Sequence, residues 1–574
     1  MPIIELLDNT LIDKIAAGEV IERPASVVKE LVENSLDAGS STIKIDILNG
    51  GKHLIRIADD GCGMAADDAH NCIKRHATSK IRQESDLLRL QTLGFRGEAL
   101  SSISSVSRMT ITTARADSPA GTAIEIHGGA VKNFRQCAAI GTTIEVRELF
   151  YNTPARKKFL KSTQSELSYI LDTITNAALS YINVEFVVNV DERQVMALPG
   201  APTLEERIQQ IYGGKFLDGL LPFKKESQGA SIEGLSSKEG NYRRSKSHQY
   251  MFINQRPIKD NVLRYAAYQA YKTLLRDAQH PIFFLYLKLN PAEVDFNVHP
   301  TKKEVRFADR DFVYRMTLSC IGKAIIKSPD SGQQHMPDST LTAVEFQAIS
   351  SAPPINMDHV FSENTTAATA PAVNATANHV PAALPLSHAR NFIYLGDVYA
   401  AYAHDDGLYV IDHHAAHERV LYEKFKTSHR LTTNRLLFPY NVTLPVREYA
   451  LVSGNISLLN EMGIEIEDFG SGMFILRALP LELSSADIAA ILSDIASSLV
   501  DVTVESPVDI IKDIIAKRIA CHASVRGKAM LSDEELSRLI DDLSAAADPE
   551  HCPHGRPTQI FLSIDSLRKQ FKRT

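Results

Sequence analysis

Imidazole, thiol and carboxylate side chains gather in three segments near the end of the chain, and together they could hold a divalent metal. In the first, DHHAAHERVLYE at 412–423, His414 and Glu418 are four residues apart and share one face of a helix. Imidazole beside carboxylate suits zinc or manganese. The other two segments, ACHASVRG at 520–527 and CPHGRP at 552–557, add thiols and a further imidazole. The alternative is that the charges of the first segment are only a solvated helix face.

A second group of residues, within the first 150 positions, could bind a nucleotide. In VVKELVENSLDAG, Glu30, Asn34 and Asp37 fall on one helix face, where a carboxylate can serve a water and an amide can bind Mg²⁺. Asp59 ends a strand in ADDGCGM and could accept a hydrogen bond from the amino group of a base. The glycines of LGFRGEAL at 93–100 could cradle phosphate with backbone N–H groups. No GxxxxGK[ST] pattern occurs, so a P-loop NTPase is disfavoured.

These residues must be positioned by a small set of elements. The nucleotide-site pattern predicts a helix ended by Gly39, strands at 42–50 and 54–61, and a strand that starts with GTT at 141–143. The metal pattern predicts a helix from about residue 413 that follows a short apolar strand. A further helix is predicted at 488–500.

Each part of the nucleotide pattern is weak by itself, but the four parts in this order resemble the GHKL ATPases, which include gyrase, Hsp90, histidine kinases and MutL. The resemblance implies Glu30 as general base, Asn34 as Mg²⁺ ligand and Asp59 as the adenine reader. It also implies that ATP is surrounded by Asp37, Gly63, Thr78, Ser79, Gly94, Arg96, Gly97 and Thr143.

Longer segments narrow the resemblance to the MutL family of DNA mismatch repair proteins, over nearly all of residues 1–325. They are RHATSKI (75–81), GFRGEALSSISSVS, LFYNTPARKKFLK (149–161) and FNVHPTKKEVRF (296–307). The resemblance implies that RHATSKI belongs to a lid and that Lys302 reaches the γ-phosphate. It further implies that ATP orders the lid and dimerises the N-terminal domains, and that hydrolysis reopens them. One departure is Asp60, where the family usually has Asn; its charge is expected to weaken nucleotide binding slightly.

The C-terminal segments resemble those of MutL proteins that nick DNA, which carry DQHAxxExxxxE, ACxxxxR, CPHGRP and a final FxR. The matching positions are Asp412, His414, Ala415, Glu418 and Glu423; Ala520, Cys521 and Arg526; Cys552 to Pro557; and Phe571, Lys572 and Arg573. The resemblance implies catalytic roles for Asp412, Glu418 and Glu423. The ligand chemistry predicts a metal held by His414, Glu418, Cys521, Cys552 and His554.

The ligand types predict how such a metal centre works. Thiolates hold Zn²⁺ tightly and carboxylates suit Mn²⁺ or Mg²⁺, so we expect a tight regulatory zinc and a weaker catalytic metal that serves phosphodiester hydrolysis. His413 stands where the family has Gln, and it and His522 remain open as further ligands, whereas His417 is expected at the surface. The alternative is a closed zinc site that only stabilises the domain.

The length of 574 residues and the shifts in composition indicate a multi-domain protein of α/β and α+β class. We expect a GHKL (Bergerat) ATPase fold at 1–204, a ribosomal-S5-like α/β transducer domain at 205–327, a disordered linker at 328–389, and an α+β dimerisation and endonuclease domain at 390–574. The linker is rich in Ala, Pro, Ser and Thr, and as a coil it would span about 40–45 Å.

The expected partners are DNA, a second copy of the chain and two proteins. The net charge of −7 excludes a globally basic DNA binder, so sequence-nonspecific contacts would use two basic groups. These are Arg156, Lys157, Lys158 and Lys161, and Lys224, Lys225, Arg243, Arg244 and Lys246. The resemblance implies a homodimer through the C-terminal domain, the mismatch sensor MutS, and a sliding clamp. The clamp would bind NRLLFP, a degenerate motif at Asn434, Leu436, Leu437 and Pro439, for which the alternative is an ordinary edge strand.

Cellular location follows from what the chain lacks. There is no apolar run long enough to cross a membrane and no signal-peptide pattern, and the six cysteines form no disulfide framework. We therefore expect the bacterial cytoplasm, at the nucleoid. The overall prediction is an ATP-switched mismatch repair protein that nicks DNA. The alternatives are an ATP-dependent matchmaker with a structural zinc, and a topoisomerase or chaperone that shares the ATP fold.

Overall fold

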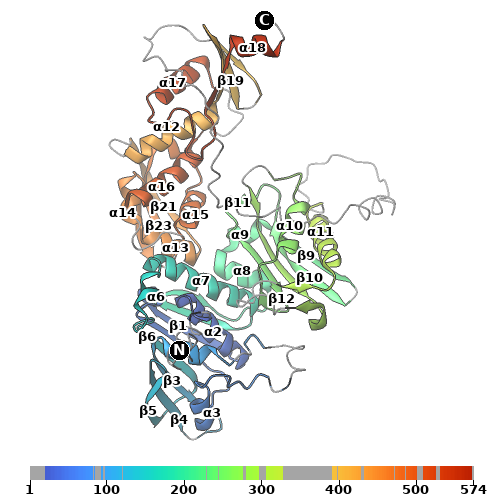
Figure 1. The fold of residues 1–574 in the computed structure, drawn as a ribbon, viewed down its shortest axis with the longest axis vertical. Coiled ribbons are helices and arrows are strands. Elements are labelled where there is room, and N and C mark those ends of the chain that lie inside the picture. The colour runs from blue at the N-terminus through green and yellow to red at the C-terminus, as the bar shows by residue number, and fades with distance from the viewer. Residues whose placement is uncertain are drawn as a thin grey trace, which may run out of the picture. The chain divides into compact units, whose positions relative to one another are not determined.

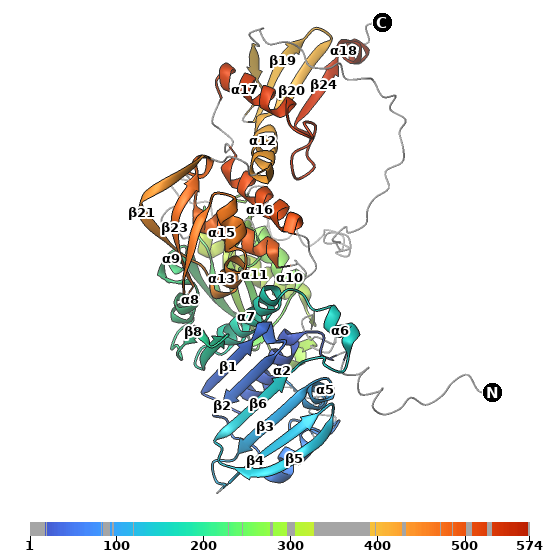
Figure 2. The ribbon, with the colours of Figure 1, turned by 90° about the vertical axis from the view of Figure 1, so that its left-hand side faces the viewer.

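The computed structural model describes most of the chain outside the expected linker. The described residues are 18, 20–81, 83, 92–94, 97–118, 120–227, 229–243, 245–275, 279–295, 305–326, 391–396, 398–427, 432–470, 472–484, 486–500, 508–524 and 531–571. Several predicted residues lie outside them: Arg96, Arg244, Lys302, Arg526, Lys572, Arg573 and the linker. Figures 1 and 2 show the ribbon from two sides.

The N-terminal region is an eight-stranded sheet with helices on one face (Figure 2). The strand order is β5-β4-β3-β6-β2-β1-β7-β8, and the β1–β7 pair is parallel. The elements are α2 (Pro24–Asp37), β1 (Thr42–Leu48), η1 (Asn49–Gly51), β2 (Leu54–Asp59), α3 (Ala66–Asn71), α5 (Ala99–Ser105), β3 (Arg108–Ala114), β4 (Gly121–His127), β5 (Ala130–Cys137), β6 (Gly141–Arg147), α6 (Pro154–Lys158), α7 (Thr163–Ser180), β7 (Glu185–Val190) and β8 (Arg193–Leu198). The core lies between the sheet and α2 and α7.

Helix α2 forms as the sequence pattern predicts. Pro24 opens it, Val28, Leu31 and Val32 are buried against the sheet, and the chain leaves through Gly39 at a φ of +73°. This burial turns the polar positions of the helix away from the core. The predicted strand that starts with GTT is confirmed as β6, and a Cβ at Gly141 would lie 2.0 Å from the carbonyl oxygen of Asp59 at the end of β2.

The second region is a five-stranded sheet of order β13-β12-β15-β10-β9, with apolar residues on both faces. Helices α10 and α11 cover one face and α8 packs on the other (Figure 1). Its elements are α8 (Leu204–Tyr212), α9 (Gly214–Asp218), β9 (Leu220–Ser227), β10 (Ala230–Ser237), β11 (Tyr242–Arg243), β12 (Gln249–Ile253), β13 (Arg256–Pro257), α10 (Asn261–Ala270), β14 (His280–Pro281), β15 (Phe283–Lys288), η2 (Pro291–Glu293), β16 (Val294–Asp295), β17 (Arg306–Phe307) and α11 (Arg310–Ile326).

The C-terminal region has two sheets, β18-β19-β20-β24 and β21-β23-β22, each with its own apolar core. Its elements are β18 (Phe392–Tyr394), β19 (Tyr399–His404), β20 (Gly407–Asp412), α12 (His413–Thr427), β21 (Thr433–Thr443), α13 (Val446–Ser453), α14 (Ile456–Glu461), β22 (Glu465–Gly470), β23 (Met473–Pro480), η4 (Leu481–Leu483), α15 (Ile488–Leu499), α16 (Val508–Ala523), α17 (Asp533–Ser544), β24 (Gln559–Ser563) and α18 (Ile564–Gln570).

Helix α12 belongs to both of these cores. Ala416 packs with α17 in the core of the first sheet, whereas Leu421, Tyr422 and Phe425 pack with α15 and α16 in the core of the second. The middle of α12, where Glu418 lies, is therefore the junction between the two halves of this region. The predicted helix that starts at about residue 413 is confirmed as α12, which continues to Thr427, and the predicted helix at 488–500 is confirmed as α15, which ends one residue earlier.

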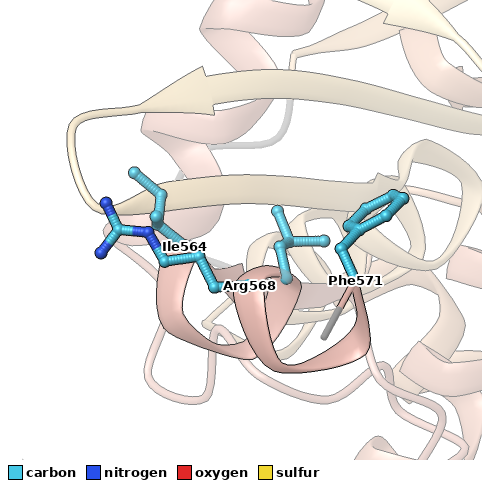
Figure 3. A pocket seen from close by; sticks show the side chains of 4 residues that line it. Ile564, Arg568 and Phe571 are labelled. Atoms are coloured by element: carbon cyan, nitrogen blue, oxygen red, sulfur yellow. The ribbon is translucent and has the colours of Figure 1, made fainter. Parts of the chain in front are cut away.

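The first sheet also has a second apolar face. Its register aligns Ile393, Ala401, Val410 and Ile560 in one row across the four strands, and cross-strand partners share a face. Ile393 and Ile560 are more than half exposed. Beyond β24, helix α18 carries exposed Ile564 and Phe571, which with Leu567 and Arg568 line a shallow pocket along the helix (Figure 3).

None of the helices among the described residues has the length and hydropathy that a membrane crossing requires.

Candidate nucleotide and metal sites

Asp59, the predicted adenine reader, is held by two hydrogen bonds. Ser35 Oγ of α2 donates to Oδ2 at 2.7 Å, and the backbone N–H of Gly61 donates to Oδ1 at 3.0 Å. The carboxylate is therefore oriented by the same helix that carries Glu30 and Asn34. Gly63 is required by packing, because its φ is +63° and a Cβ there would lie 1.9 Å from the carbonyl oxygen of Ala114.

The strand register shows which threonine of GTT shares a face of the sheet with Asp59, whereas the contact of Thr143 with nucleotide stays a prediction. Asp59 pairs with Thr142 across β2 and β6, so these two side chains share the helix-covered face of the sheet. Thr143 pairs with Ala58 and lies on the opposite face. The strand periodicity of two thus assigns Thr142, and not Thr143, to the face that carries Asp59.

Asp37 and Lys80 connect the described segments of the predicted ATP site by hydrogen bonds. Lys80 Nζ donates to Asp37 Oδ2 at 2.6 Å and to Asn34 Oδ1 at 2.8 Å. Asp37 also accepts the backbone N–H groups of Leu93 and Gly94, at 2.9 and 3.1 Å. The N–H of Gly94, which the sequence assigned to phosphate, thus binds a carboxylate here. Sequence reasoning missed Lys80, although it stands in RHATSKI next to the predicted Thr78 and Ser79.

The expected lid segment contacts the glycine segment that follows it. Gly97 has a φ of +63°, and a Cβ there would lie 2.7 Å from the carbonyl oxygen of Ala77. His76 Nδ1 lies 3.5 Å from Glu98 Oε1. Thr78 accepts a hydrogen bond from the backbone N–H of Lys80 at 3.2 Å. Glu30 is partly exposed on α2, with Lys29 Nζ 3.3 Å from its Oε1.

The expected weakening of nucleotide binding by Asp60 has no support in the geometry. Its carboxylate accepts the backbone N–H groups of Ser41 and Thr42, at 2.8 and 2.9 Å, and also the hydroxyl of Ser41. Burial opposes ionisation, but these hydrogen bonds together outweigh it and lower the pKa of Asp60. The side chain fixes the turn between α2 and β1, a task that Asn could also perform.

Three of the predicted metal ligands come together in the C-terminal region. Glu418 of α12, Cys521 near the end of α16 and His554 of the CPHGRP segment have ligand atoms within 4.8 Å of one another. Glu418 is buried, and burial lowers the pKa of His554, which favours the neutral imidazole that binds metals. A carboxylate oxygen, a thiol sulfur and an imidazole nitrogen at this spacing fit zinc, so the donor set suits the metal that the sequence implies.

The other two predicted ligands border this group. His414 Nε2 lies 3.5 Å from Glu418 Oε1, one helical turn earlier on α12. Cys552 is buried, and its Sγ accepts the backbone N–H of His554 at 3.4 Å. Among the described residues, the group with mutual distances within 4.8 Å contains neither of them.

Glu423 and Asp412, both predicted as catalytic, are used for hydrogen bonds to the backbone. Glu423 accepts the N–H of Ala547, at 3.0 and 2.7 Å for its two oxygens, and the N–H of Asp548 at 3.3 Å. Asp412 Oδ1 accepts the N–H groups of His414 and Ala415, at 3.1 and 3.0 Å, and so caps α12. Both ends of the acidic motif thus accept backbone hydrogen bonds, and the catalytic roles of Asp412 and Glu423 stay a prediction.

The three additional histidines have other surroundings. His413 is fully buried with its ring against Tyr394. His522 is buried, and its Nε2 lies 2.7 Å from Asp494 Oδ2, which gives it a carboxylate partner on α15. His417, expected at the surface, is partly buried, and burial and the neighbouring His414 and His413 lower its pKa.

Comparisons with known proteins give a consistent family. Family models match in three stretches: "Histidine kinase-, DNA gyrase B-, and HSP90-like ATPase" at 21–147, "DNA mismatch repair protein, C-terminal domain" at 208–325, and "MutL C terminal dimerisation domain" at 393–531. The DNA mismatch repair protein MutL of Thermodesulfovibrio yellowstonii is 37% identical, and the alignment covers 99% of each chain. The chain belongs to the MutL family of DNA mismatch repair proteins.

The chain is also similar to other MutL proteins. The MutL of Geobacter sulfurreducens is 38% identical, again over 99% of both chains. The solved ATPase domain of Aquifex aeolicus MutL complexed with ADP is 30% identical, covering 47% of this chain and 94% of that one, with a TM-score of 0.37. The predicted fold class is confirmed: this MutL family member has an N-terminal GHKL ATPase fold and a C-terminal dimerisation domain. It is an ATP-binding ATPase of mismatch repair. The domain boundaries stay a prediction.

The predicted clamp-binding segment lies on an exposed edge of the MutL C-terminal region. Strand β21 pairs only with β23 in its sheet, and the pairing is interrupted between Arg435 and Tyr440. Leu437 and Phe438 are 89% and 80% exposed there, whereas Leu436 packs against the core. The exposed apolar side chains at the bulge are therefore Leu437, which belongs to the predicted motif, and Phe438, which the sequence analysis did not select.

The two predicted basic groups differ in how their charge is balanced. In the second group, Lys224 lies 3.3 Å from Glu233 and 3.8 Å from Glu226, so acids offset the charge of this lysine. In the first group, Lys157 and Lys158 of α6 are exposed beside Phe159, which is also exposed. A basic, aromatic surface of this kind is the better candidate for contact with a nucleic acid backbone.

Proposed function

We propose that this protein is an endonuclease-bearing MutL, which couples an ATP-driven change of shape to nicking of DNA after a mismatch has been recognised. The observation that carries the proposal is the convergence of Glu418, Cys521 and His554 from three segments far apart in the sequence. A solvated helix face gives no reason for a thiol and an imidazole from two other segments to meet its buried carboxylate.

The chemistry follows from the donor set. A bound divalent ion would supply an activated water and stabilise the leaving oxygen of a phosphodiester. Glu418, Cys521 and His554 would hold the ion, with His414 adjacent, and a tight Zn²⁺ with a weaker Mn²⁺ or Mg²⁺ is the expected loading. Arg556, exposed in the same loop as His554, could bind the phosphate that is cut.

In the ATPase region, the proposed roles begin with Glu30 as general base and Asn34 as Mg²⁺ ligand. Asp59, held by Ser35 and accompanied by Thr142, would read the adenine. Lys80 would couple the nucleotide to the lid. Its ammonium donates to Asn34 Oδ1 and has to leave this oxygen before the oxygen can bind Mg²⁺, and Lys80 itself belongs to the expected lid. Ligand binding and lid movement would then be linked through one side chain.

The surface suggests where two copies meet. The row Ile393, Ala401, Val410 and Ile560 leaves one face of the first C-terminal sheet apolar, while α12 and α17 cover the other face. We place the constitutive homodimer contact on this open face, since an uncovered apolar sheet face of this kind normally binds a partner.

Other partners complete the proposal. DNA would be bound without sequence preference through the first basic group, a sliding clamp through Leu437 and Phe438, and the mismatch signal would come from MutS. The expected place of work is the nucleoid of a bacterial cell.

The test is nicking of supercoiled DNA with Mn²⁺ by the wild-type chain, by Glu418→Ala and by His414→Ala. We expect the Glu418 variant to lose at least about 100-fold of the activity while its ATPase rate stays within about twofold. Undiminished nicking by either variant would remove the nuclease assignment. The second candidate function, an ATP-dependent matchmaker with a structural zinc, would then stand, since the same three ligands would only hold the domain together.

A further inference from the structure

Arg419 directly follows the proposed ligand Glu418 on α12 and reaches the segment that leads to the CPHGRP loop. Its Nε donates to the carbonyl oxygen of His551 at 2.5 Å, and another guanidinium nitrogen donates to Asp548 Oδ2 at 3.0 Å. A third nitrogen lies 3.6 Å from Glu423 Oε1. The Arg419 side chain is only 10% exposed and that of Glu423 is 22% exposed, whereas that of Asp548 is 47% exposed.

Glu423, one turn further along α12, holds the same segment by its backbone. It accepts the N–H groups of Ala547 and Asp548, which come after the end of α17 and have no partner in that helix. Arg419 and Glu423 therefore bind residues 547–551 through groups of that segment: one carbonyl oxygen, one carboxylate and two backbone N–H groups. Neither belongs to the group formed by Glu418, Cys521 and His554.

The gripped segment continues into a closed loop that carries His554. The N–H of Cys552 donates to the carbonyl oxygen of Arg556 at 2.8 Å, and the N–H of Gly555 donates to that of Cys552 at 2.9 Å. Gly555 has a φ of +80°, and Thr558 bonds back to Glu550 and Pro549. Because these hydrogen bonds close the loop on itself, we expect the contacts at its base to determine where His554 lies relative to Glu418.

We propose that Arg419 and Glu423 are positioning residues that hold the loop of residues 547–556 on α12 and so set the metal affinity of the site without binding the metal. This inference rests on the proposed metal site. It gives Glu423 a different role from the catalytic one that the sequence implied. The geometry demands Arg, because a lysine ammonium cannot reach a carbonyl, Asp548 and Glu423 as a planar fork does.

The test is zinc affinity of the full-length chain, measured by competition with a chromophoric chelator, for wild type, Arg419→Lys, Glu423→Gln and Glu418→Gln. We expect the first two variants to bind zinc about 10- to 100-fold more weakly, with the stoichiometry of wild type at saturation. Glu418→Gln, which alters a ligand, should lose stoichiometric binding. The matched control is Arg477→Lys, since Arg477 also grips a carboxylate, that of Glu467, with two bonds of 2.7 Å, but on the exposed face of another sheet. Its zinc affinity should equal that of wild type.

A second measurement, made without metal, separates this inference from the proposed function. Amide hydrogen exchange at residues 547–556 should speed up at least about 10-fold in Arg419→Lys and Glu423→Gln, and not in Arg477→Lys. If wild type binds no zinc, the proposed metal site is wrong, and the exchange rates still show whether Arg419 and Glu423 hold the loop. Unchanged exchange together with unchanged zinc affinity would overturn the positioning role. Loss of stoichiometric zinc in Glu423→Gln would overturn it too, because Glu423 would then be a ligand.

Discussion

At the scale of single residues, the electrostatic partner of Asp37 is the feature that matters most at the ATP site. Its carboxylate is 8% exposed and receives the Lys80 ammonium as well as two N–H groups. Removal of the ammonium would leave a nearly buried carboxylate without its cation, and such a loss costs about 1–3 kcal/mol.

Lys80→Met should therefore lower the thermal midpoint of the full-length protein measured without nucleotide, by a few degrees. The double variant Lys80→Met/Asp37→Asn should recover part of that loss, because the unpaired charge is then gone. An equal loss in the single and double variants would show that the ammonium does not stabilise Asp37.

In contrast to the charge of Asp37, the charge of Asp60 is expected to matter little at the ATP site. Its two backbone hydrogen bonds occupy the carboxylate at the turn before β1. Asp60→Asn should therefore leave ATP affinity within about twofold, since Asn keeps an oxygen for the same N–H groups. Fluorescent-nucleotide titration measures this, and a rise in affinity of 10-fold or more would restore the idea that the extra charge opposes the nucleotide.

At the scale of elements, the pairing of α12 with α16 brings Cys521 to Glu418. The two helices are joined at their other ends by Asp513, which accepts the hydroxyl of Tyr422 and lies 3.1 Å from Lys426 Nζ. Burial raises the pKa of Asp513, but these hydrogen bonds and that of Lys517 outweigh it and lower the pKa from 3.8 to about 2. A carboxyl with a lowered pKa stabilises the folded state when it is ionised.

Asp513→Asn should therefore destabilise the C-terminal region at neutral pH by about 1 kcal/mol, a value reduced for the exposure of the group. The contribution is complete above pH 3.8 and is lost as the pH falls toward 2. The difference between wild type and variant, measured by denaturant titration at several pH values, should shrink across that interval. A difference that stays constant down to pH 2 would contradict the link.

Strand β21 shows a second consequence at this scale. Its bulge turns Leu437 and Phe438 outward while Leu436 stays in the core. Leu437→Ser/Phe438→Ser should abolish sliding-clamp binding and leave the thermal midpoint unchanged, whereas Leu436→Ala should lower the midpoint. If the double variant still binds immobilised clamp, the segment is an ordinary edge strand and not a clamp-binding motif.

At the scale of the whole molecule, association depends on the open face of the first C-terminal sheet. A carboxylate placed at Val410 or Ile560 would be buried without a partner in the dimer, so Ile560→Asp should raise the dimer dissociation constant about 100-fold or more. Analytical ultracentrifugation measures this. The Leu437→Ser/Phe438→Ser variant, changed on another sheet, is the control that should remain dimeric. If the Ile560→Asp variant remains dimeric, the dimer interface does not include this face of the sheet.

The sequence by itself determined the fold class, the ATP motif on α2 and β2, and the three segments that meet at the proposed metal site. Helical and strand periodicity, glycines that only one backbone conformation accepts, and ligand-type side chains are local properties, so they can be read from the chain. The structure alone decided which threonine faces Asp59, that Lys80 lies between Asn34 and Asp37, and that Glu423 holds a loop. These depend on strand register and on contacts between residues far apart in the sequence. Such contacts are set by packing of the whole fold, and no local pattern records them.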